Sequence, residues 1–247
     1  MDGSAARVAP LTGDALDVTA APADERVAKV LQLRRAVAAA GHPTASPAAT
    51  PLPLAPEVEH LVADGVLRRG TIVEVSGSPL LAISMAAGPL RSGGWAACVG
   101  VPALGWSAAA AGGWELSRVI SVAPPVRRWA SVVGALVDAV DVVLLGPDPS
   151  PTAAEARRLH ARARERGTVL ILVGDHADRS AGGVGAGVRG GWSDLADIRL
   201  QVTAVEWTGI GRGWGHLAAG KLVVECSGRR GGARPRRAEV ALPGGCT

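Results

Sequence analysis

The sequence lacks phenylalanine and tyrosine altogether, so its only large aromatic side chains are seven tryptophans. A platform that stacks the bases of single-stranded nucleic acid would therefore have only Trp, His or Arg to use. Cysteine is scarce as well, because Cys98, Cys226 and Cys246 form no CxxC pair and no Cys/His ligand set. This pattern argues against a disulfide scaffold and a structural zinc site, and it indicates a reduced, cytosolic protein.

Long apolar runs and a targeting segment are also missing. No charge-free apolar stretch reaches the ~18 residues of a spanning helix, so we expect no membrane association. The N-terminus, MDGSAARVAPLTGDALDV, carries acids where a signal peptide would carry basic and apolar segments. With 247 residues, of which 48% are hydrophobic and 19% charged, the chain can bury the core of one α/β domain with appendages.

Positive charge is concentrated towards the C-terminus. The net charge is +4, yet residues 211–247 carry seven basic and two acidic side chains, so this segment is +5 and the rest is −1. Five arginines fall within nine residues: Arg229, Arg230, Arg234, Arg236 and Arg237. An unpaired guanidinium is costly to bury, so these side chains are expected either to stay solvated or to bind the carboxylates or phosphates of a partner. We define residues 228–247 as a basic C-terminal segment with a final strand at 238–242.

The N-terminal part is predicted to be a helix on a tether. Residues 1–22 show no apolar period and are expected to be disordered. Residues 23–41 are predicted to form an amphipathic helix, on which Val27, Val30 and Leu31 recur at helical spacing. Residues 42–56 contain five prolines in fifteen residues and are predicted to be a linker. Such a helix is expected to dock either on its own domain or on another chain.

Strand and helix patterns alternate through a predicted core at residues 57–227. The apolar runs at 141–145 and 169–173 show no alternation, as strands covered on both faces require. Alternating strands and helices predict a mainly parallel sheet. Predicted helices are 57–63, 80–87, 104–112, 129–138 and 153–166, and predicted strands are 71–75, 95–101, 119–122, 141–145 and 169–173. Three further strands at 198–205, 221–226 and 238–242 have no helices between them, so the sheet is expected to end in antiparallel strands.

The first strand-to-helix turn has the spacing of a phosphate-binding loop without its chemistry. A working loop reads G-x-x-x-x-G-K-[ST]. The corresponding residues here are Gly77, Ser78, Ala82, Ile83 and Ser84. Only the first glycine and the final serine remain, and Pro79 removes one backbone amide from the cradle. We therefore expect no nucleotide, no cofactor and no metal at this turn.

Several segments carry a resemblance to a known family. The segments LSRVISVAPPVRRWASVVGALVDAVDVVLLG and TVLILVGDHADRSAGGVGAGVRGGWSDLADIRLQV follow the RecA order of strand, helix, central strand and glycine-rich loop. From about Pro53 to Leu242 the chain resembles the RecA superfamily. Within it, LRRGTIVEVSGSP, AAEARRLHARARERG, LADIRLQVTAVEW and ECSGRRGGARPRRAEVALPG are similar to ImuA and its shorter relative ImuA-prime. The resemblance implies a RecA-like P-loop-type core with a degenerate phosphate loop.

The same resemblance implies the loss of catalysis. Aligned by element, the phosphate-loop lysine becomes Ile83, the water-activating acid falls near Pro102, and the Mg²⁺-assisting aspartate falls at Gly146. These three positions serve different parts of phosphoryl transfer, so the resemblance implies a pseudo-ATPase and not an enzyme. No other set of side chains suggests a different reaction.

ImuA-type proteins accompany ImuB, an inactive Y-family polymerase relative, and through it an error-prone replicative-type polymerase. The resemblance thus implies a non-catalytic adaptor of a bacterial mutasome that acts in the SOS response to DNA damage, in translesion synthesis and mutagenesis. Such a protein would be cytoplasmic and nucleoid-associated in the complex. Its predicted partner-binding residues are the five arginines and the apolar stripe Val27, Val30 and Leu31.

An alternative function is a DNA-binding or nucleotide-responsive RecA homologue that modulates recombination filaments. The loop at 182–192 contains six glycines and resembles in position the RecA loop that touches single-stranded DNA. Its candidate DNA contacts are Arg179, Arg189 and Trp192, which are few, so at most weak and salt-sensitive binding is expected. An idle loop and self-association of the chain are left open by the sequence.

Overall fold

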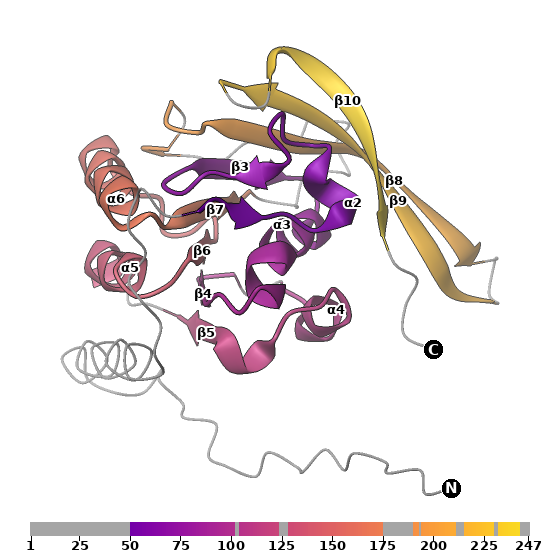
Figure 1. Ribbon diagram of the computed structural model, residues 1–247, viewed down its shortest axis with the longest axis horizontal. Helices are drawn as coiled ribbons and strands as arrows, with labels where there is room; N and C mark the ends of the chain where they lie inside the picture. Colours follow the sequence, from indigo (N-terminus) through magenta and orange to yellow (C-terminus); the bar gives the residue numbers. More distant parts are fainter. Residues whose placement is uncertain are drawn as a thin grey trace, which may run out of the picture.

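The computed structural model describes residues 50–101, 104–123, 128–174, 190–192, 194–210, 215–229 and 232–242. Eight strands form the main sheet: β3 (Ile72–Ser76), β4 (Ala96–Val99), β5 (Val119–Val122), β6 (Val142–Leu145), β7 (Val169–Val173), β8 (Ile198–Ile210), β9 (Gly215–Gly228) and β10 (Gly232–Leu242). Their order across the sheet is β10-β9-β8-β3-β7-β6-β4-β5 (Figure 1). The strands β3 to β8 pair in parallel, whereas β9 and β10 are antiparallel. This arrangement confirms the expected α/β class, with a mainly parallel sheet and antiparallel strands at its C-terminal end.

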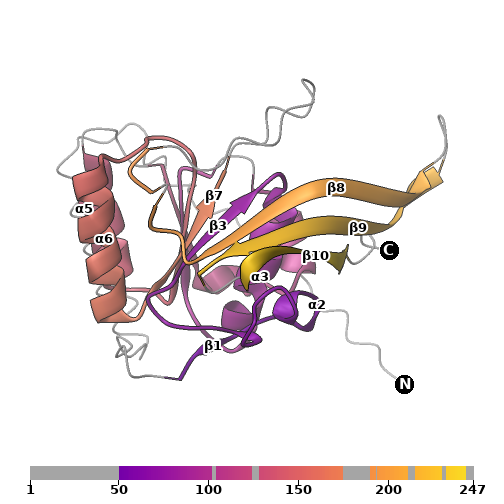
Figure 2. The same cartoon turned by 90° about the horizontal axis from the view of Figure 1, so that it is seen from above.

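Helices cover both faces of the parallel part of the sheet. They are α2 (Pro56–Glu59), α3 (Pro79–Arg91), α4 (Trp106–Ala111), α5 (Trp129–Val137) and α6 (Ala153–Arg166), with a short 3-10 helix η1 (Leu116–Arg118). Figure 2 shows α5 and α6 on one side and α2 and α3 on the other. The fully buried strands β6 and β7 alternate between two cores. Val142 and Ile171 belong to the core under α3, and Val143 and Leu170 to the core under α5 and α6.

Local sequence signals explain why several helices and strands begin and end at the predicted residues. The helix α6 and the strands β5 and β7 begin and end as predicted. At the start of α6 the Thr152 hydroxyl accepts from the Glu155 amide, and the Glu155 carboxylate accepts from the Thr152 amide. Gly167 ends the helix in the left-handed conformation, with φ 72°. Other elements differ from the prediction mainly in length, because β8 and β9 extend well beyond the predicted strands.

The packed unit begins inside the predicted linker. The structure gives a two-stranded sheet of β1 (Leu52–Pro53) and β2 (Val66–Leu67), and Leu52, Leu54 and Ala55 are all buried in the core under α3. The backbone around Pro53 can pack against α3 because position 88 is a glycine; a side chain there would overlap the carbonyl oxygen of Pro53. The predicted boundary between linker and core at residue 57 is therefore too late. The predicted N-terminal segments at 1–22 and 23–41 lie outside the described residues.

The antiparallel strands at the end of the sheet form a wing that projects past the parallel strands (Figures 1 and 2). The strand β8 pairs with β3 only from Ile198 to Gln201. Beyond Gln201 it pairs with β9. The strand β10 pairs with β9 from Gly232 to Leu242. The predicted boundary at residue 228 therefore cuts through the sheet, because β10 belongs to it. No helix in the described part of the chain is long and apolar enough to cross a membrane.

Candidate functional site

The first strand-to-helix turn, where a ligand of an open α/β sheet is expected, is tightly packed. Gly77 follows β3 with φ +86°, and a side chain there would come within 2.7 Å of the Val202 carbonyl oxygen on β8. Ser78 precedes α3 without a side-chain cap, and Pro79 occupies the first helical position. Ser78 is only 4% exposed, so the turn offers little of its surface to a ligand.

The remaining residues of the degenerate loop point into the protein. Ala82, Ile83 and Ser84 are all buried on the first turns of α3. The backbone oxygen of Ile83 accepts a hydrogen bond of 2.9 Å from the indole nitrogen of Trp114. The structure therefore brings the predicted loop residues together at the start of α3. Ile83, which stands where a phosphate loop has its lysine, serves the core there.

A second position at the same edge of the sheet is closed by backbone. Gly146 follows β6, and its amide donates to the Val99 carbonyl at 2.9 Å. A side chain at Gly146 would overlap the carbonyl oxygen of Gly100. An aspartate could not replace Gly146 without a shift of the neighbouring chain, so the residue expected to assist Mg²⁺ has no room here. Pro102, the third position implied by the resemblance, lies outside the described residues.

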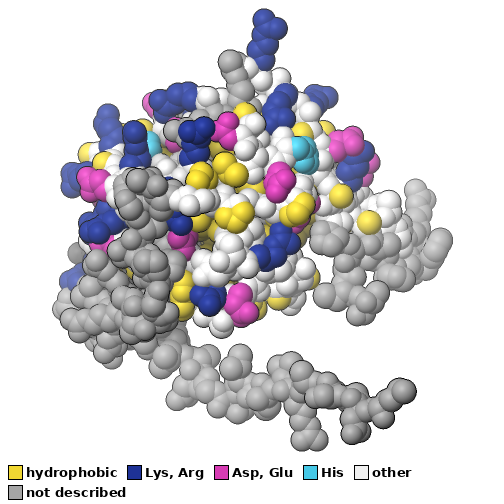
Figure 3. Space-filling model, in the orientation of Figure 1, with side chains coloured by type: hydrophobic (Ala, Val, Ile, Leu, Met, Phe, Trp, Pro, Cys, Tyr) yellow, Lys and Arg dark blue, Asp and Glu magenta, His cyan; other side chains and the backbone are white. Residues whose placement is uncertain are grey.

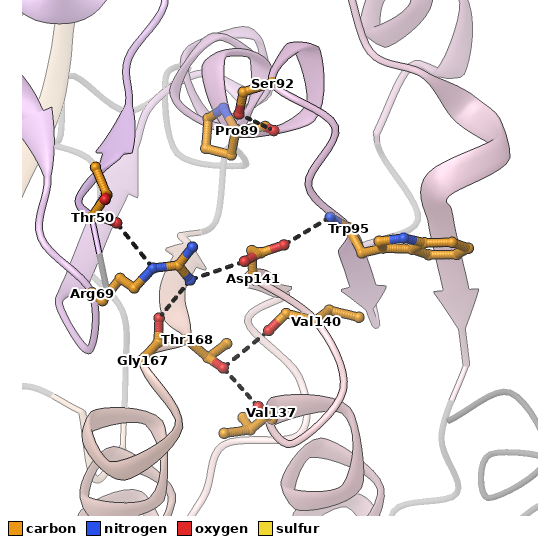
Figure 4. Close-up of polar contacts among 10 residues, drawn as sticks. All are labelled: Thr50, Arg69, Pro89, Ser92, Trp95, Val137, Val140, Asp141, Gly167 and Thr168. Carbon is orange, nitrogen blue, oxygen red and sulfur yellow. Dashed lines mark hydrogen bonds and ion pairs between the residues drawn. The ribbon is translucent and has the colours of Figure 1, made fainter. Parts of the chain in front are cut away.

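The opposite edge of the sheet, where the parallel strands begin, holds a buried polar cluster (Figure 4). The guanidinium of Arg69 donates to the Asp141 carboxylate at 2.9 Å, to the Gly167 carbonyl at 3.3 Å and to the Thr50 carbonyl at 3.1 Å. The other carboxylate oxygen of Asp141 accepts from the Trp95 amide at 3.0 Å. The cluster links the segments that precede β1, β3, β4, β6 and β7, so its role is structural.

Two neighbouring contacts complete this edge. The Thr168 hydroxyl lies 2.6 Å from the Val137 carbonyl and 3.0 Å from the Val140 carbonyl, which fixes the end of α5. Asp138, whose side chain is 1% exposed, accepts two hydrogen bonds from Arg162 at 2.6 and 2.7 Å. Hydrogen bonding to Asp138 is the main reason why the pKa of Arg162 is raised. Sequence reasoning did not predict these partners, because they come from distant parts of the chain.

The basic residues at the C-terminal end are part of the sheet and its turn. Arg229, Arg234 and Arg237 are exposed and Arg236 is half-buried, whereas Arg230 lies outside the described residues. The strand that carries them is anchored by Val240 and Leu242, which are 0% and 7% exposed. The imidazole of His60 also donates to the Glu239 carbonyl at 2.9 Å. The part of the predicted basic segment from Gly232 to Leu242 is therefore an edge strand, which includes the final strand predicted at 238–242 and has Val240 and Leu242 fixed in the core.

Of the three predicted DNA contacts, Trp192 lies within the described residues. Trp192 is 3% exposed and packs in the core under α5 and α6, so it cannot stack on a base without leaving that core. Gly191 lies against the backbone of Thr152 and leaves no room for a side chain. The prediction for Trp192 is wrong because its glycine neighbours serve close packing at this end of the loop. Arg179, Arg189, Val27, Val30 and Leu31 lie outside the described residues.

The two described cysteines are buried and poorly suited to thiolate chemistry. Burial raises the pKa of Cys98 to about 12. Burial also raises the pKa of Cys226, with a smaller rise from Glu225 opposed by Arg236. A thiol that stays protonated at neutral pH is a weak nucleophile and a weak metal ligand. Among the described side chains, no group of three or more His, Cys, Asp or Glu is placed to hold a metal ion.

The family comparison covers much of the parallel part of the fold. Residues 60–178, just under half of the chain, match the family described as the MT3502 N-terminal domain. Over 108 residues the chain is 40% identical to the uncharacterized protein Rv3395c of Mycobacterium tuberculosis. These residues make up 43% of this chain and 53% of that protein. The chain thus spans about half the length of this curated relative. The family match includes β3 to β7 and leaves out the wing of β8, β9 and β10.

A solved structure is similar to the chain at low identity. The crystal structure of the RadB recombinase aligns with a TM-score of 0.43 and 17% sequence identity. The alignment covers 69% of this chain and 86% of that chain.

Proposed function

We propose that this chain is a non-catalytic, RecA-like accessory protein of a bacterial DNA-damage tolerance complex, and that β10 binds an ImuB-type polymerase relative. Through that partner the chain would act with an error-prone replicative-type polymerase in translesion synthesis. The observation that carries the proposal is the character of β10, which is an edge strand with exposed arginines and an anchored apolar side. The sequence resemblance to ImuA supplies the candidate partner.

The packed phosphate-loop turn supports an accessory role over an enzymatic one. Phosphoryl transfer needs positive charge and a metal placed around the phosphates. Here Ile83 is buried where the lysine is expected, and the Gly100 backbone occupies the space next to Gly146. A protein with this turn can still act through its surface, because an adaptor needs interaction surfaces and no chemical site.

The edge of β10 is suited to a protein partner. No described strand pairs with its outer side, and such an edge can accept an additional strand. Arg234 and Arg237 form no ion pair with any acidic residue in the described part of the chain. Arginine makes forked contacts with carboxylates, so an acidic strand or segment of the partner would fit this edge.

The structure changes how the proposal should be tested. Truncation after Ser227 would remove β10 and expose Leu222 and Val224, both fully buried beside it, so loss of binding could reflect unfolding. Arg234→Glu/Arg237→Glu changes only exposed positions and keeps the strand. We expect this variant to lose most of its affinity for purified ImuB-type protein in a pull-down and in a binding titration.

A charge-matched control keeps the test specific. Arg91→Glu/Arg158→Glu makes the same double charge reversal on α3 and α6, leaves β10 unchanged, and should bind the partner like the wild type. Undiminished binding by Arg234→Glu/Arg237→Glu, with circular dichroism showing a folded protein, would overturn the proposal. Binding that requires added ATP and Mg²⁺ would instead favour a nucleotide-responsive RecA homologue.

A further inference from the structure

The helix α6 carries more positive charge than its packing requires. Within Ala153–Arg166 it has five arginines against two glutamates. All five arginines are exposed: Arg157, Arg158, Arg162, Arg164 and Arg166. Figure 3 shows Lys and Arg side chains gathered over the side of the molecule where Figure 1 places α6. The inner face is formed by Ala156, Leu159 and Ala163, so the arginines are distributed around the remaining surface.

The arginines of α6 divide into two groups. Arg162 and Arg166 both pair with the buried Asp138 at the end of α5, at 2.6 and 3.2 Å, so they hold the two helices together. Arg157 and Arg164 lie on the other flank. They are seven residues apart, which is nearly two helical turns, so they share one line along the helix with a rise of about 10.5 Å.

A third arginine adjoins this flank from the end of β9. His160 lies between Arg157 and Arg164 in the sequence and on the same side of the helix. Arg229 follows Gly228, which packs against the backbone of Asp197. The pKa of His160 is lowered mainly by burial; Asp197 opposes this shift, and Arg164 and Arg229 add to it. We call Arg157, Arg164 and Arg229 the α6 basic row.

No ion pair joins Arg157, Arg164 or Arg229 to an acidic residue in the described part of the chain, and Arg157 donates to the Ala153 carbonyl at 3.1 Å. The nearby acids have other contacts. Glu155 accepts from the Thr152 amide and hydroxyl at the start of α6, and Asp197 accepts from the Ile72 amide at 3.1 Å. The row is therefore available to an external anion.

The surroundings of the row favour a phosphate backbone over a protein. Protein interfaces depend on large apolar or aromatic anchors at their centre. The large exposed apolar side chains of the described structure are Trp106, Leu116 and Trp207, and none of them lies on α6. Phosphate contacts need only positive charge and hydrogen-bond donors, and arginine supplies both.

We propose that the α6 basic row binds the phosphate backbone of a nucleic acid. This surface lies on α6 and at the end of β9, and it goes beyond the accessory function proposed above. It gives an accessory protein a direct, sequence-independent contact with DNA. Because such a contact releases counterions, its strength should depend steeply on salt.

The test compares two variants of equal net charge in the full chain. Arg157→Gln/Arg164→Gln removes two charges of the row, and Arg91→Gln/Arg158→Gln removes two exposed charges elsewhere. The side chain of Arg158 lies about 100° around the helix from that of Arg157, and Arg91 is on α3 across the sheet. Glutamine has nearly the helix propensity of arginine, so α6 should remain intact.

Binding is measured by fluorescence anisotropy with a labelled mixed-sequence oligonucleotide of about 20 nucleotides, single-stranded and as a duplex, between about 50 and 200 mM salt. We expect the row variant to bind at least about tenfold more weakly at the lowest salt, and its log–log salt slope to be shallower by about 1.4 to 1.8. Adding Arg229→Gln should reduce the slope by a further ~0.7 to 0.9. The control variant should retain a clearly larger share of the affinity.

Three results would overturn the inference. These are no wild-type binding at low salt, an equal loss in the two variants, and complete competition by poly-glutamate at equal charge concentration. The last result would point to an acidic protein instead. Failure here is distinguishable from failure of the proposed function, because that function is tested with a different ligand and with variants of β10.

Discussion

Loss of the buried carboxylate of Asp141 should destabilise the whole domain. Its side chain is 4% exposed, and it accepts from Arg69 at 2.9 Å and from the Trp95 amide at 3.0 Å. In Asp141→Ala the guanidinium of Arg69, itself 12% exposed, keeps only the carbonyls of Gly167 and Thr50 among its described partners. Removing one partner of a buried pair costs about 3–5 kcal/mol, a large part of the 5–15 kcal/mol that holds a typical domain folded.

The exposed pair between Arg68 and Asp64 provides the matched control. These residues are four apart, with side chains 57% and 48% exposed, and their shortest contact is 2.8 Å. Asp64→Ala should cost only about 0.3–0.5 kcal/mol, because solvent screens such pairs. Unfolding in urea, followed by circular dichroism and tryptophan fluorescence, measures both values.

The difference between the two aspartates decides whether burial sets the cost. A loss in Asp141→Ala within about 1 kcal/mol of that in Asp64→Ala would refute the reasoning. A second comparison uses Arg69→Met/Asp141→Leu, which replaces both charges with apolar groups. This variant should regain much of the stability lost in Asp141→Ala, since no buried charge is then left without its partner.

Three further predictions follow from buried positions. The purified chain should show no Mg²⁺-dependent ATP hydrolysis above that of a Ser84→Ala variant prepared in parallel; turnover found only in the wild type would contradict the packed loop. Trp192→Ala should lower the free energy of unfolding by about 3–5 kcal/mol in urea titrations, whereas an exposed loop residue would cost far less. Because the pKa of Cys98 is raised to about 12 from 9.0, the native thiol stays protonated while the unfolded one ionises. The free energy of unfolding that the protonated Cys98 thiol contributes should therefore be fully present below pH 9 and be lost as pH rises towards 12. In Cys98→Val the free energy of unfolding should fall less over this pH range.

The parallel part of the fold could be predicted because its signals are local. The apolar runs that became β6 and β7 are buried on both faces, as their lack of alternation required. The helix α6 has its own start at Thr152 and its own end at Gly167, so its boundaries needed no tertiary information. The spacing after β3 likewise located the loop residues at the start of α3, although it did not show that Ile83 packs inward.

The misses share a cause, which is that tertiary packing overrode composition. Proline and arginine content suggested a linker and a tail, yet Leu52 and Leu54 alternate with prolines, and Val240 and Leu242 alternate with exposed residues. That period of two is typical of a strand with one buried face; it supports the strand predicted at 238–242, which the structure extends back to Gly232. For Trp192 the surrounding glycines hid a core residue, and the only signal available was the cost of exposing a tryptophan.

Chemistry and binding make different demands on this fold. A nucleotide site would require the Gly100 backbone to move away from Gly146 and a charge to replace the buried Ile83, so each step would cost stability. The two proposed surfaces carry no such cost. Arg157 and Arg164 lie on a helix whose ends are fixed by Thr152 and Gly167, and the arginines of β10 lie on a strand anchored by its apolar residues. Substitutions at exposed arginines change stability little, so partner and nucleic-acid contacts can vary here while the core is kept.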